Sequence, residues 1–242
     1  MRVFDFSQNF WQFIVMALVS YLIGCFNFAR IIAKHKHKDI TKIGSGNPGT
    51  MNMSREFGWK IGALTFVLDA VKGGIVVLAG HLLYQGYVFS GTQISVTDVA
   101  RYFCGVFAVL GHIVPITAKF KGGKGIATAF GVFWVGLSCE KGWYAAVVLG
   151  MLIGVLLFIY FTEWGSLGNL VGTAAFCIFQ TVIFIFRYQL NTVSAYMVWM
   201  YMQIFVFMLM TWLAHHGNVV RLLSGEEHRT SLKKIVQKKN KE

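Results

Sequence analysis

Charged residues are scarce in this chain: they make up 13% of its 242 residues, whereas hydrophobic residues make up 56%. An ordinary soluble domain has about 25% charged and about 45–50% apolar residues, so the composition excludes such a domain. Proline is also nearly absent, with 2 residues beside 26 glycines. This balance suits helices that pack closely through small residues, and weighs against a disordered chain or a membrane barrel. We therefore expect one helical membrane domain over residues 1–230.

Clusters of metal-binding residues are missing as well. The four cysteines are scattered singly, mostly within apolar stretches, at positions 25, 104, 139 and 177. The sequence has no C-x-x-C pair or Cys/His cluster with the spacing of a metal site. It therefore predicts no metal site and no cofactor, and we interpret the cysteines as core residues.

Long apolar runs dominate what remains. They cover about residues 10–33, 59–84, 98–118, 126–138, 143–162, 167–187 and 193–214. Most approach the roughly 20 residues that a membrane-spanning helix needs. The first run leads straight into a basic loop, so we interpret it as a retained helix and not as a signal peptide. The sequence predicts an all-α integral membrane protein, a seven-transmembrane-helix bundle whose short fourth helix is tilted or partly re-entrant.

The distribution of positive charge predicts partners and orientation. A net charge of +12 would suggest nucleic acid for a soluble protein, but these basic residues lie in loops beside apolar runs. Anionic lipid and anionic substrates are the expected partners instead. Lysine and arginine gather in residues 34–60, 119–124 and 221–241, whereas the loop at 85–98 has none. Because cytoplasmic loops are positive, we expect the N-terminus outside and the C-terminus in the cytoplasm, with a basic tail at 231–242 that lies on lipid or stays disordered.

Polar, glycine-rich segments all fall on the cytoplasmic side of this topology. They are residues 44–55, 119–125, 163–169 and 215–227. Four such segments on one face are more typical of an active site than of four independent linkers.

The first of these segments reads GSGNPGTMN from residue 44 and is followed by Arg55. Such a run can fold tightly around an oxyanion, and an arginine can hold a phosphate with two parallel N–H bonds. The same residue types also build ordinary turns. Convergence with a lysine-rich loop favours the functional interpretation. The candidates for phosphate binding in this segment are Ser45, Gly46, Asn47, Thr50 and Asn52.

The second segment, KFKGGKG at 119–125, is cationic and lies between two apolar runs. Glycines let backbone N–H groups approach a phosphate closely, and lysines supply the opposing charge. We therefore expect Gly122, Gly123 and Lys124 to hold an anion, aided by the N-terminus of the helix that follows. A Walker-type nucleotide loop is not supported, because its required Gly and Ser or Thr are missing around the lysine.

The remaining polar positions supply further donors. Ser166, His215 and Asn218 can each donate to a phosphate oxygen, and a histidine can carry a proton near neutral pH or cap a helix. Asp69 and Lys72 stand three residues apart inside the second apolar run, on one helical face. Charges inside the membrane must face the bundle interior or a cavity, so this pair is either a structural ion pair or part of the site.

Several motifs resemble one known family. They are GSGN-x-G at 44–49, N-x-x-R at 52–55, GH-x-x-P at 111–115, FKGGKG-x-AT at 120–128, and H-x-x-N with R-L-x-x-G-x-E at 215–227. Together, from about the first helix to Glu227, they resemble the bacterial acyl-phosphate:glycerol-3-phosphate acyltransferases of the PlsY type.

The resemblance implies a multi-pass enzyme of the bacterial inner membrane with its active site facing the cytoplasm. It would move a fatty acyl chain from acyl phosphate to the 1-hydroxyl of glycerol 3-phosphate, giving lysophosphatidic acid and phosphate, the first acylation of phospholipid synthesis. The functional positions that it implies are Ser45, Arg55, Lys124, Ser166, His215 and Asn218, with the Gly122-Gly123 backbone in a phosphate-binding loop and Glu227 structural.

The chemistry of an acyl phosphate agrees with these residues. It is a mixed anhydride with a good leaving group, so positioning, charge neutralisation and proton removal suffice without a covalent nucleophile or a metal. The H-x4-D signature of acyl-CoA-dependent enzymes is absent, which makes acyl-CoA the less expected donor.

Two departures and one alternative stand beside this interpretation. The chain has Thr50-Met51 where the family reads Ala-Thr, and His216 where it usually has Arg. A transporter or channel for an organic phosphate anion would also need a basic cavity within a helical bundle. Transporters tend to show inverted repeats and a site at the midplane, whereas the polar segments here gather at one surface.

Overall fold

The computed structural model describes residues 1–189, 194–232 and 235. Most of this chain is helical. The elements in order are β1 (Arg2–Phe4), α1 (Phe6–Gly24), α2 (Phe28–His35), α3 (Thr50–Phe57), α4 (Trp59–Tyr84), β2 (Tyr87–Phe89), α5 (Val96–Ile113), a 3-10 turn η1 (Ile116–Ala118), α6 (Ile126–Glu140), α7 (Tyr144–Thr162), α8 (Gly165–Tyr188), α9 (Ala195–Leu213) and α10 (His216–Leu223).

Every predicted apolar run is largely helical, and six helical segments are long and apolar enough to cross a membrane. The prediction of an all-α integral membrane fold is confirmed. The first run is interrupted where the Asn27 side chain accepts a hydrogen bond from the Arg30 amide (2.9 Å) and caps α2. The fourth run forms α6, which has 15 residues and is shorter than the other six segments. A seventh crossing is therefore not established.

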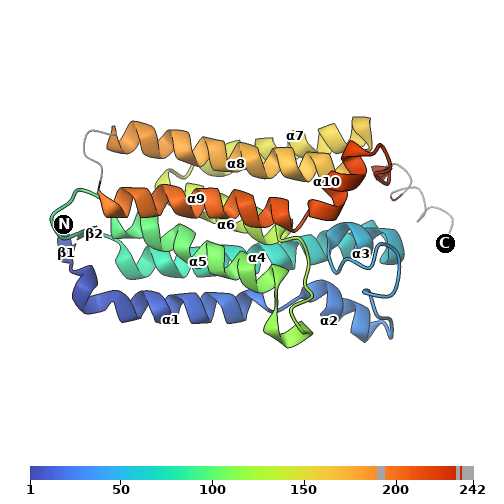
Figure 1. Ribbon diagram of the computed structural model, residues 1–242, viewed down its shortest axis with the longest axis horizontal. Helices are drawn as coiled ribbons and strands as arrows, with labels where there is room; N and C mark the ends of the chain where they lie inside the picture. Colours follow the sequence, from blue (N-terminus) through green and yellow to red (C-terminus); the bar gives the residue numbers. More distant parts are fainter. Residues whose placement is uncertain (190–193, 233–234, 236–242) are drawn as a thin grey trace.

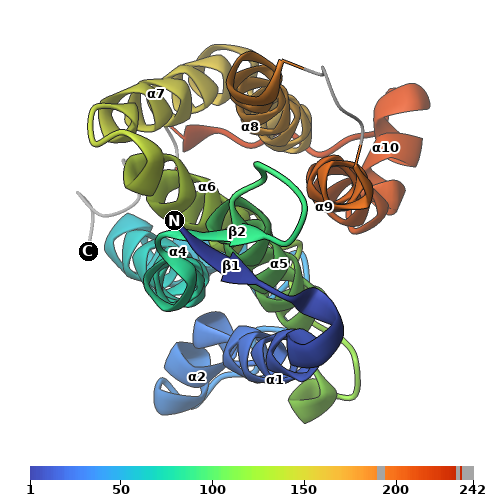
Figure 2. The same ribbon diagram turned by 90° about the vertical axis from the view of Figure 1, so that its left-hand side faces the viewer.

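The long helices lie side by side, with the short elements divided between the two ends of the bundle (Figure 1). The parallel ribbon of β1 and β2 lies at one end, beside the N-terminus, whereas α2, α3 and α10 lie at the other. Seen along the bundle, α4, α5 and α6 form the middle, with α1 on one side and α7 and α8 on the other (Figure 2). We call the end with β1 and β2 the ribbon end and the opposite end the loop end.

Small residues allow the central helices to approach closely. A Cβ on Gly73 of α4 would collide with the backbone oxygen of Thr128 on α6, and a Cβ on Gly131 of α6 would collide with that of Ala70 on α4. Membrane helices associate through such close backbone contacts, because lipid gives little hydrophobic driving force between them. The contact fixes α6, and with it the loop that precedes α6, against α4.

A buried ion cluster closes the ribbon end. The Arg101 guanidinium, 1% exposed, contacts the carboxylates of Asp98 and Glu140 (2.9 Å to Glu140 Oε1). Arg187 contacts the other oxygens of both carboxylates at 2.6 Å, and Tyr188 donates to Asp98 (2.6 Å). These residues come from α5, α6 and α8, so the cluster holds three helices together. No local sequence pattern predicts this cluster, because the pairs that join different helices lie about 40–90 positions apart.

Candidate active site

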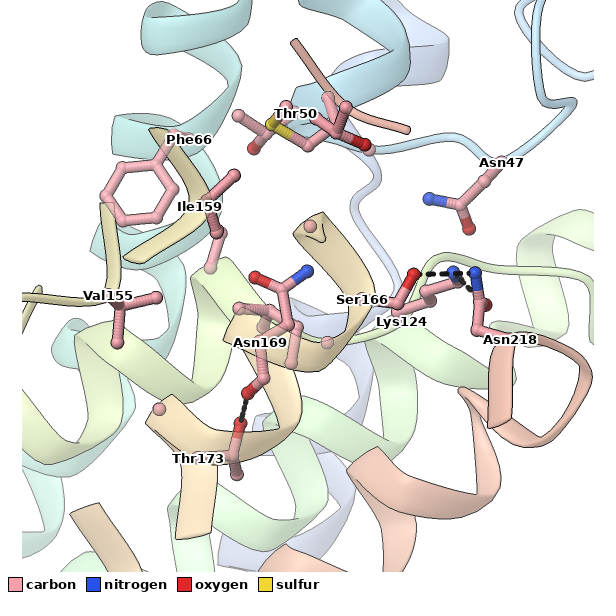
Figure 3. Close-up of a pocket in the computed structure, with 18 of the residues that line it drawn as sticks. Asn47, Thr50, Phe66, Lys124, Val155, Ile159, Ser166, Asn169, Thr173 and Asn218 are labelled. Carbon is pink, nitrogen blue, oxygen red and sulfur yellow. Dashed lines mark hydrogen bonds between the residues drawn. The ribbon is translucent and has the colours of Figure 1, made fainter. Parts of the chain in front are cut away.

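A cavity of about 310 Å³ opens at the loop end, next to the N-terminus of α6. All four predicted polar segments contribute to its lining, together with α4, α5, α6, α7 and α8. Figure 3 shows Lys124, Ser166 and Asn218 pointing toward one another on one side of the space, and Phe66, Val155 and Ile159 on the other. The cavity therefore has a polar part and an apolar part.

The polar part is built around Lys124. Its Nζ donates to Oδ1 of Asn218, and Asn218 Nδ2 donates to Ser166 Oγ (2.9 Å) and Glu227 Oε1 (2.7 Å). The Ser166 hydroxyl also donates to Glu227, whose other oxygen accepts from Arg221 Nε at 2.9 Å. Three predicted segments meet in this one network. Glu227 accepts three of these hydrogen bonds, from Ser166, Asn218 and Arg221, and its structural role stays a prediction.

Burial and neighbouring charges shift the ionisation of this network. Burial, with repulsion from Arg221 and Arg55, lowers the pKa of Lys124 to about 8, although Glu227 opposes the shift. Partial burial disfavours the Glu227 carboxylate, but hydrogen bonds from Ser166, Asn218 and Arg221 outweigh it and lower its pKa. At neutral pH the ammonium and the carboxylate both predominate. Arg55, Lys124 and Arg221 against Glu227 leave an excess of positive charge beside the cavity.

The first polar segment divides into residues that face the cavity and one that supports them. Ser45, Asn47, Thr50 and Arg55 line the cavity, and Arg55 donates from Nη2 to the Thr230 hydroxyl (2.8 Å). Asn52 also borders the cavity, but its amide nitrogen donates to two backbone oxygens, those of Ile40 (3.2 Å) and Ile43 (3.0 Å). Its Oδ1 accepts from the Ser45 amide at 3.0 Å. The structure thus gives Asn52 a supporting role in place of the predicted phosphate contact.

The three glycines that were predicted to bind phosphate donate their amide N–H groups to backbone oxygens instead. The amides of Gly122 and Gly123 donate to the backbone oxygens of Ile113 and His112, both at 3.1 Å, and the Gly46 amide donates to Ile43 (3.0 Å). A Cβ on Gly122 or Gly123 would collide with the end of α5. These glycines let the lysine loop pack against α5, and their N–H groups are already paired. Sequence could not show this, because it does not reveal which carbonyl an amide meets.

His215 lies behind the network and is fully buried. Its Nδ1 lies 2.7 Å from the backbone oxygen of Thr211, so Nδ1 carries the proton and Nε2 keeps the lone pair. Burial first, and then the charge of Lys124, lowers its pKa to about 4. Among the described residues Nε2 has no hydrogen-bond partner, and His215 does not line the cavity. A direct contact of His215 with substrate stays a prediction.

Asp69 and Lys72 form the predicted ion pair, with Lys72 Nζ 2.8 Å from Asp69 Oδ1. The structure adds a third member, His112, whose Nδ1 lies 2.8 Å from the same Nζ. Asp69 and His112 line the cavity, whereas Lys72 does not. The GH-x-x-P motif was the one signal in the sequence that singled out His112.

The apolar part of the cavity was not predicted residue by residue. It is lined by side chains of α4, α6, α7 and α8: Phe66, Phe130, Leu152, Val155, Leu156, Ile159 and Phe176. Met51 lies beside Thr50 in the lining. Within the described residues, no group of three His, Cys, Asp or Glu side chains could hold a metal ion.

The fold and this cavity define an integral membrane protein that can hold an anionic head group and an apolar chain together. The family model of glycerol-3-phosphate acyltransferase matches residues 14–225, and the chain belongs to that family. The predicted resemblance is confirmed.

Individual relatives agree over nearly the whole length. The glycerol-3-phosphate acyltransferase of Thermoanaerobacter pseudethanolicus is 34% identical, covering 91% of this chain and 96% of its own. That of Aquifex aeolicus is 32% identical, covering 88% and 97%. The crystal structure of PlsY (YgiH), described as an integral membrane glycerol 3-phosphate acyltransferase in its glycerol 3-phosphate form, is similar with a TM-score of 0.73 at 29% identity, covering 93% of this chain and 98% of that one. Its lysophosphatidic acid form has a TM-score of 0.71.

Proposed function

We propose that the protein transfers a fatty acyl group from acyl phosphate to the 1-hydroxyl of glycerol 3-phosphate, giving lysophosphatidic acid and phosphate. One observation carries the proposal: a single cavity joins a cationic, hydrogen-bonding part to an apolar part between membrane helices. Both substrates have a phosphate, and one has a long apolar tail. The family and its solved members support the same acceptor.

The polar part suits the two phosphates. Lys124 and Arg55 supply positive charge, and Asn218, Ser45 and Asn47 supply neutral donors from other elements. Charge-assisted hydrogen bonds to phosphate are about twice as strong as neutral ones. These five residues are the ones we propose to contact substrate, together with Thr50 and Ser166, which also line the cavity.

The apolar part suits the acyl chain. Leu152, Val155 and Ile159 of α7 face Phe176 and Gly172 of α8 around the cavity. These side chains offer the acyl chain an apolar surface, so the chain can reach the polar part without exposing its methylene groups to water. Membrane lipid is the expected source and surrounding of that tail, because the outward side chains of α7 are largely exposed and apolar.

The reaction then needs little beyond positioning. The hydroxyl oxygen of glycerol 3-phosphate bonds to the carbonyl carbon of acyl phosphate, and the bond from that carbon to the bridging oxygen breaks. Phosphate leaves with the electron pair and takes the hydroxyl proton. When the two substrates are held in the reactive orientation, the step between them becomes effectively unimolecular, and this positioning alone lowers the barrier substantially. Lys124 and Arg55 stabilise the departing charge.

The topology belongs to the same proposal. We place seven helices in the bacterial cytoplasmic membrane: the six long segments and the short helix α6, which is the fourth along the chain. The N-terminus then lies outside, and the C-terminus and active site lie on the cytoplasmic side. The basic residues of α2, α3 and the lysine loop lie at the loop end, beside the cavity, which supports this orientation. The domain would extend over residues 1–230. Most of the proposed basic tail at 231–242 lies outside the described residues.

The test is a two-substrate assay with purified full-length protein in detergent, without added metal or coenzyme A. We expect lysophosphatidic acid and inorganic phosphate to appear in equal amounts. Replacement of acyl phosphate by acyl-CoA should abolish turnover. In vesicles, entry of labelled glycerol 3-phosphate without esterification would instead identify an organic phosphate transporter and refute the proposal.

A further inference from the structure

Three ionisable side chains meet at the wall of the cavity without a role in the reaction described above. They are Asp69 and Lys72 of α4 and His112 of α5, and all are at least 96% buried by their exposed fractions of 1%, 4% and 4%. Lys72 Nζ lies 2.8 Å from Asp69 Oδ1, 2.8 Å from His112 Nδ1 and 2.5 Å from the backbone oxygen of Phe26. The cluster joins α4 to α5 and to the segment between α1 and α2.

This arrangement fixes which nitrogen of His112 carries the proton. An ammonium has three N–H groups and no lone pair, so it can only donate. This ammonium lies against a carboxylate in an ion pair and is hydrogen-bonded to a carbonyl and to Nδ1. Because Nδ1 must accept, a neutral imidazole carries its proton on Nε2. Lys72 therefore turns Nε2 into a fixed donor.

The Nε2 edge of the ring lies beside the lysine loop. His112 lines the cavity, and the atom nearest to a Cβ placed on Gly123 would be His112 Nε2. Gly123 directly precedes Lys124, and it has no side chain to cover the imidazole. In the described part of the chain, Nε2 has no hydrogen-bond partner. Because His112 lines the cavity and this N–H group has no acceptor among the described residues, it can donate to a bound ligand.

We propose that His112 is a further catalytic residue, whose Nε2–H donates to the carbonyl oxygen of the acyl phosphate, and that Lys72, held by Asp69, is a positioning residue that fixes the required tautomer. The inference rests on the proposed function. The carbonyl carbon of an acyl phosphate is bonded to the phosphate's bridging oxygen, so a phosphate near Lys124 brings the carbonyl to the neighbouring residues. Gly123 is one of them, and His112 lies directly against it.

The donor would act where charge develops. When the glycerol 3-phosphate hydroxyl oxygen bonds to the carbonyl carbon, the carbonyl oxygen becomes an oxyanion. Its charge returns to re-form the double bond when the bond to phosphate breaks, and phosphate leaves with the electron pair and the hydroxyl proton. A fixed donor that is already in place lowers the energy of this transition state more than that of bound substrate. The effect should therefore appear in kcat.

A matched pair of variants separates this role from packing. In His112→Gln the side-chain amide can place an N–H group where Nε2 stood, whereas in His112→Asn the shorter amide reaches the Nδ1 position, beside Lys72. We expect His112→Asn to lower kcat about 10²–10³-fold, the usual loss for one oxyanion donor. His112→Gln should keep at least tenfold more activity, and KM for glycerol 3-phosphate should change little in both.

Removal of Lys72 gives a second signature. In Lys72→Met the imidazole keeps the Asp69 carboxylate, whose Oδ1 lies 3.6 Å from Nδ1. The Nδ1–H tautomer then donates to Asp69, and Nε2 loses its proton. A further proton taken up by the pair restores Nε2–H. We therefore expect kcat of Lys72→Met to be low at pH 8 and to rise as the pH falls, unlike that of the wild type.

The outcomes are distinct. A wild-type protein that makes no lysophosphatidic acid refutes the proposed function, whereas an active wild type with equal kcat for His112→Asn and His112→Gln refutes the role of His112. A Lys72→Met variant with a wild-type pH profile refutes the tautomer argument. Thermal unfolding in detergent identifies variants that do not fold. If His112→Asn fails to fold, the pH profile of Lys72→Met, or of Lys72→Gln, decides the inference.

Discussion

Charged side chains cluster at both ends of the bundle, but the charges are balanced at the ribbon end and unbalanced at the loop end. At the ribbon end, Arg101 and Arg187 meet Asp98 and Glu140 in pairs, so the buried charges cancel. At the loop end, the cavity is lined by Arg55, Lys124 and Arg221 and by two carboxylates, of which Asp69 is paired with Lys72 and Glu227 with Arg221. Positive charge left without a partner next to a cavity needs an anion from outside the protein. The comparison indicates that the ribbon end serves stability and the loop end serves binding.

Loss of Lys124 tests the loop end most severely. Lys124→Ala should reduce kcat/KM by about 10³-fold or more, since it removes the charge that holds the phosphate and leaves Asn218 Oδ1 without its donor. The assay is acyl transfer by the purified protein at saturating acyl phosphate. Lys119→Ala is the matched control, because Lys119 is an exposed lysine of the same loop and should be dispensable. Equal losses in the two variants would show that the loop needs only general positive charge.

The ribbon end should respond in stability and not in substrate binding. Arg101→Met leaves Asp98 and Glu140 buried with one cation between them, and breaking a buried ion pair costs about 3–5 kcal/mol. The thermal unfolding midpoint in detergent should fall strongly, while KM for glycerol 3-phosphate in the remaining folded protein stays near that of the wild type. Arg2→Met, an exposed arginine at the same end, is the control. A raised KM with unchanged stability would contradict this division of roles.

The two ends also differ in how far sequence could predict them. The residues of the loop end lie in short polar segments between apolar runs, so their convergence followed from hydropathy and the positions of lysine and arginine alone. The ribbon end joins α5, α6 and α8 through residues about 40–90 positions apart, and no local pattern links them. Pairing across such separations depends on helix packing.

Within the loop end, too, the sequence did not reveal which groups helix packing brings together. Glycine and asparagine were assigned to phosphate because their donors are suited to it. The structure shows that the amides of Gly122 and Gly123 and the side chain of Asn52 bind backbone carbonyls. Helices α3 and α10 were missed because each has only eight residues and no long apolar run. The break between α1 and α2 was missed because Asn27 stands alone among apolar residues.

The pH dependence of activity, through the ionisation of Lys124, should give the smallest of the expected effects and tests the role of the loop end. Its pKa is lowered to about 8, so the ammonium predominates below that pH and is lost as the pH rises above it. Because kcat/KM reports the free enzyme, it should fall above about pH 8, up to about tenfold per pH unit, while kcat changes less when bound phosphate holds the proton on Lys124. Arginine does not titrate in this range. Lys124→Arg should therefore lose the alkaline decline even if its activity is lower, whereas an unchanged decline would assign the titration to another group.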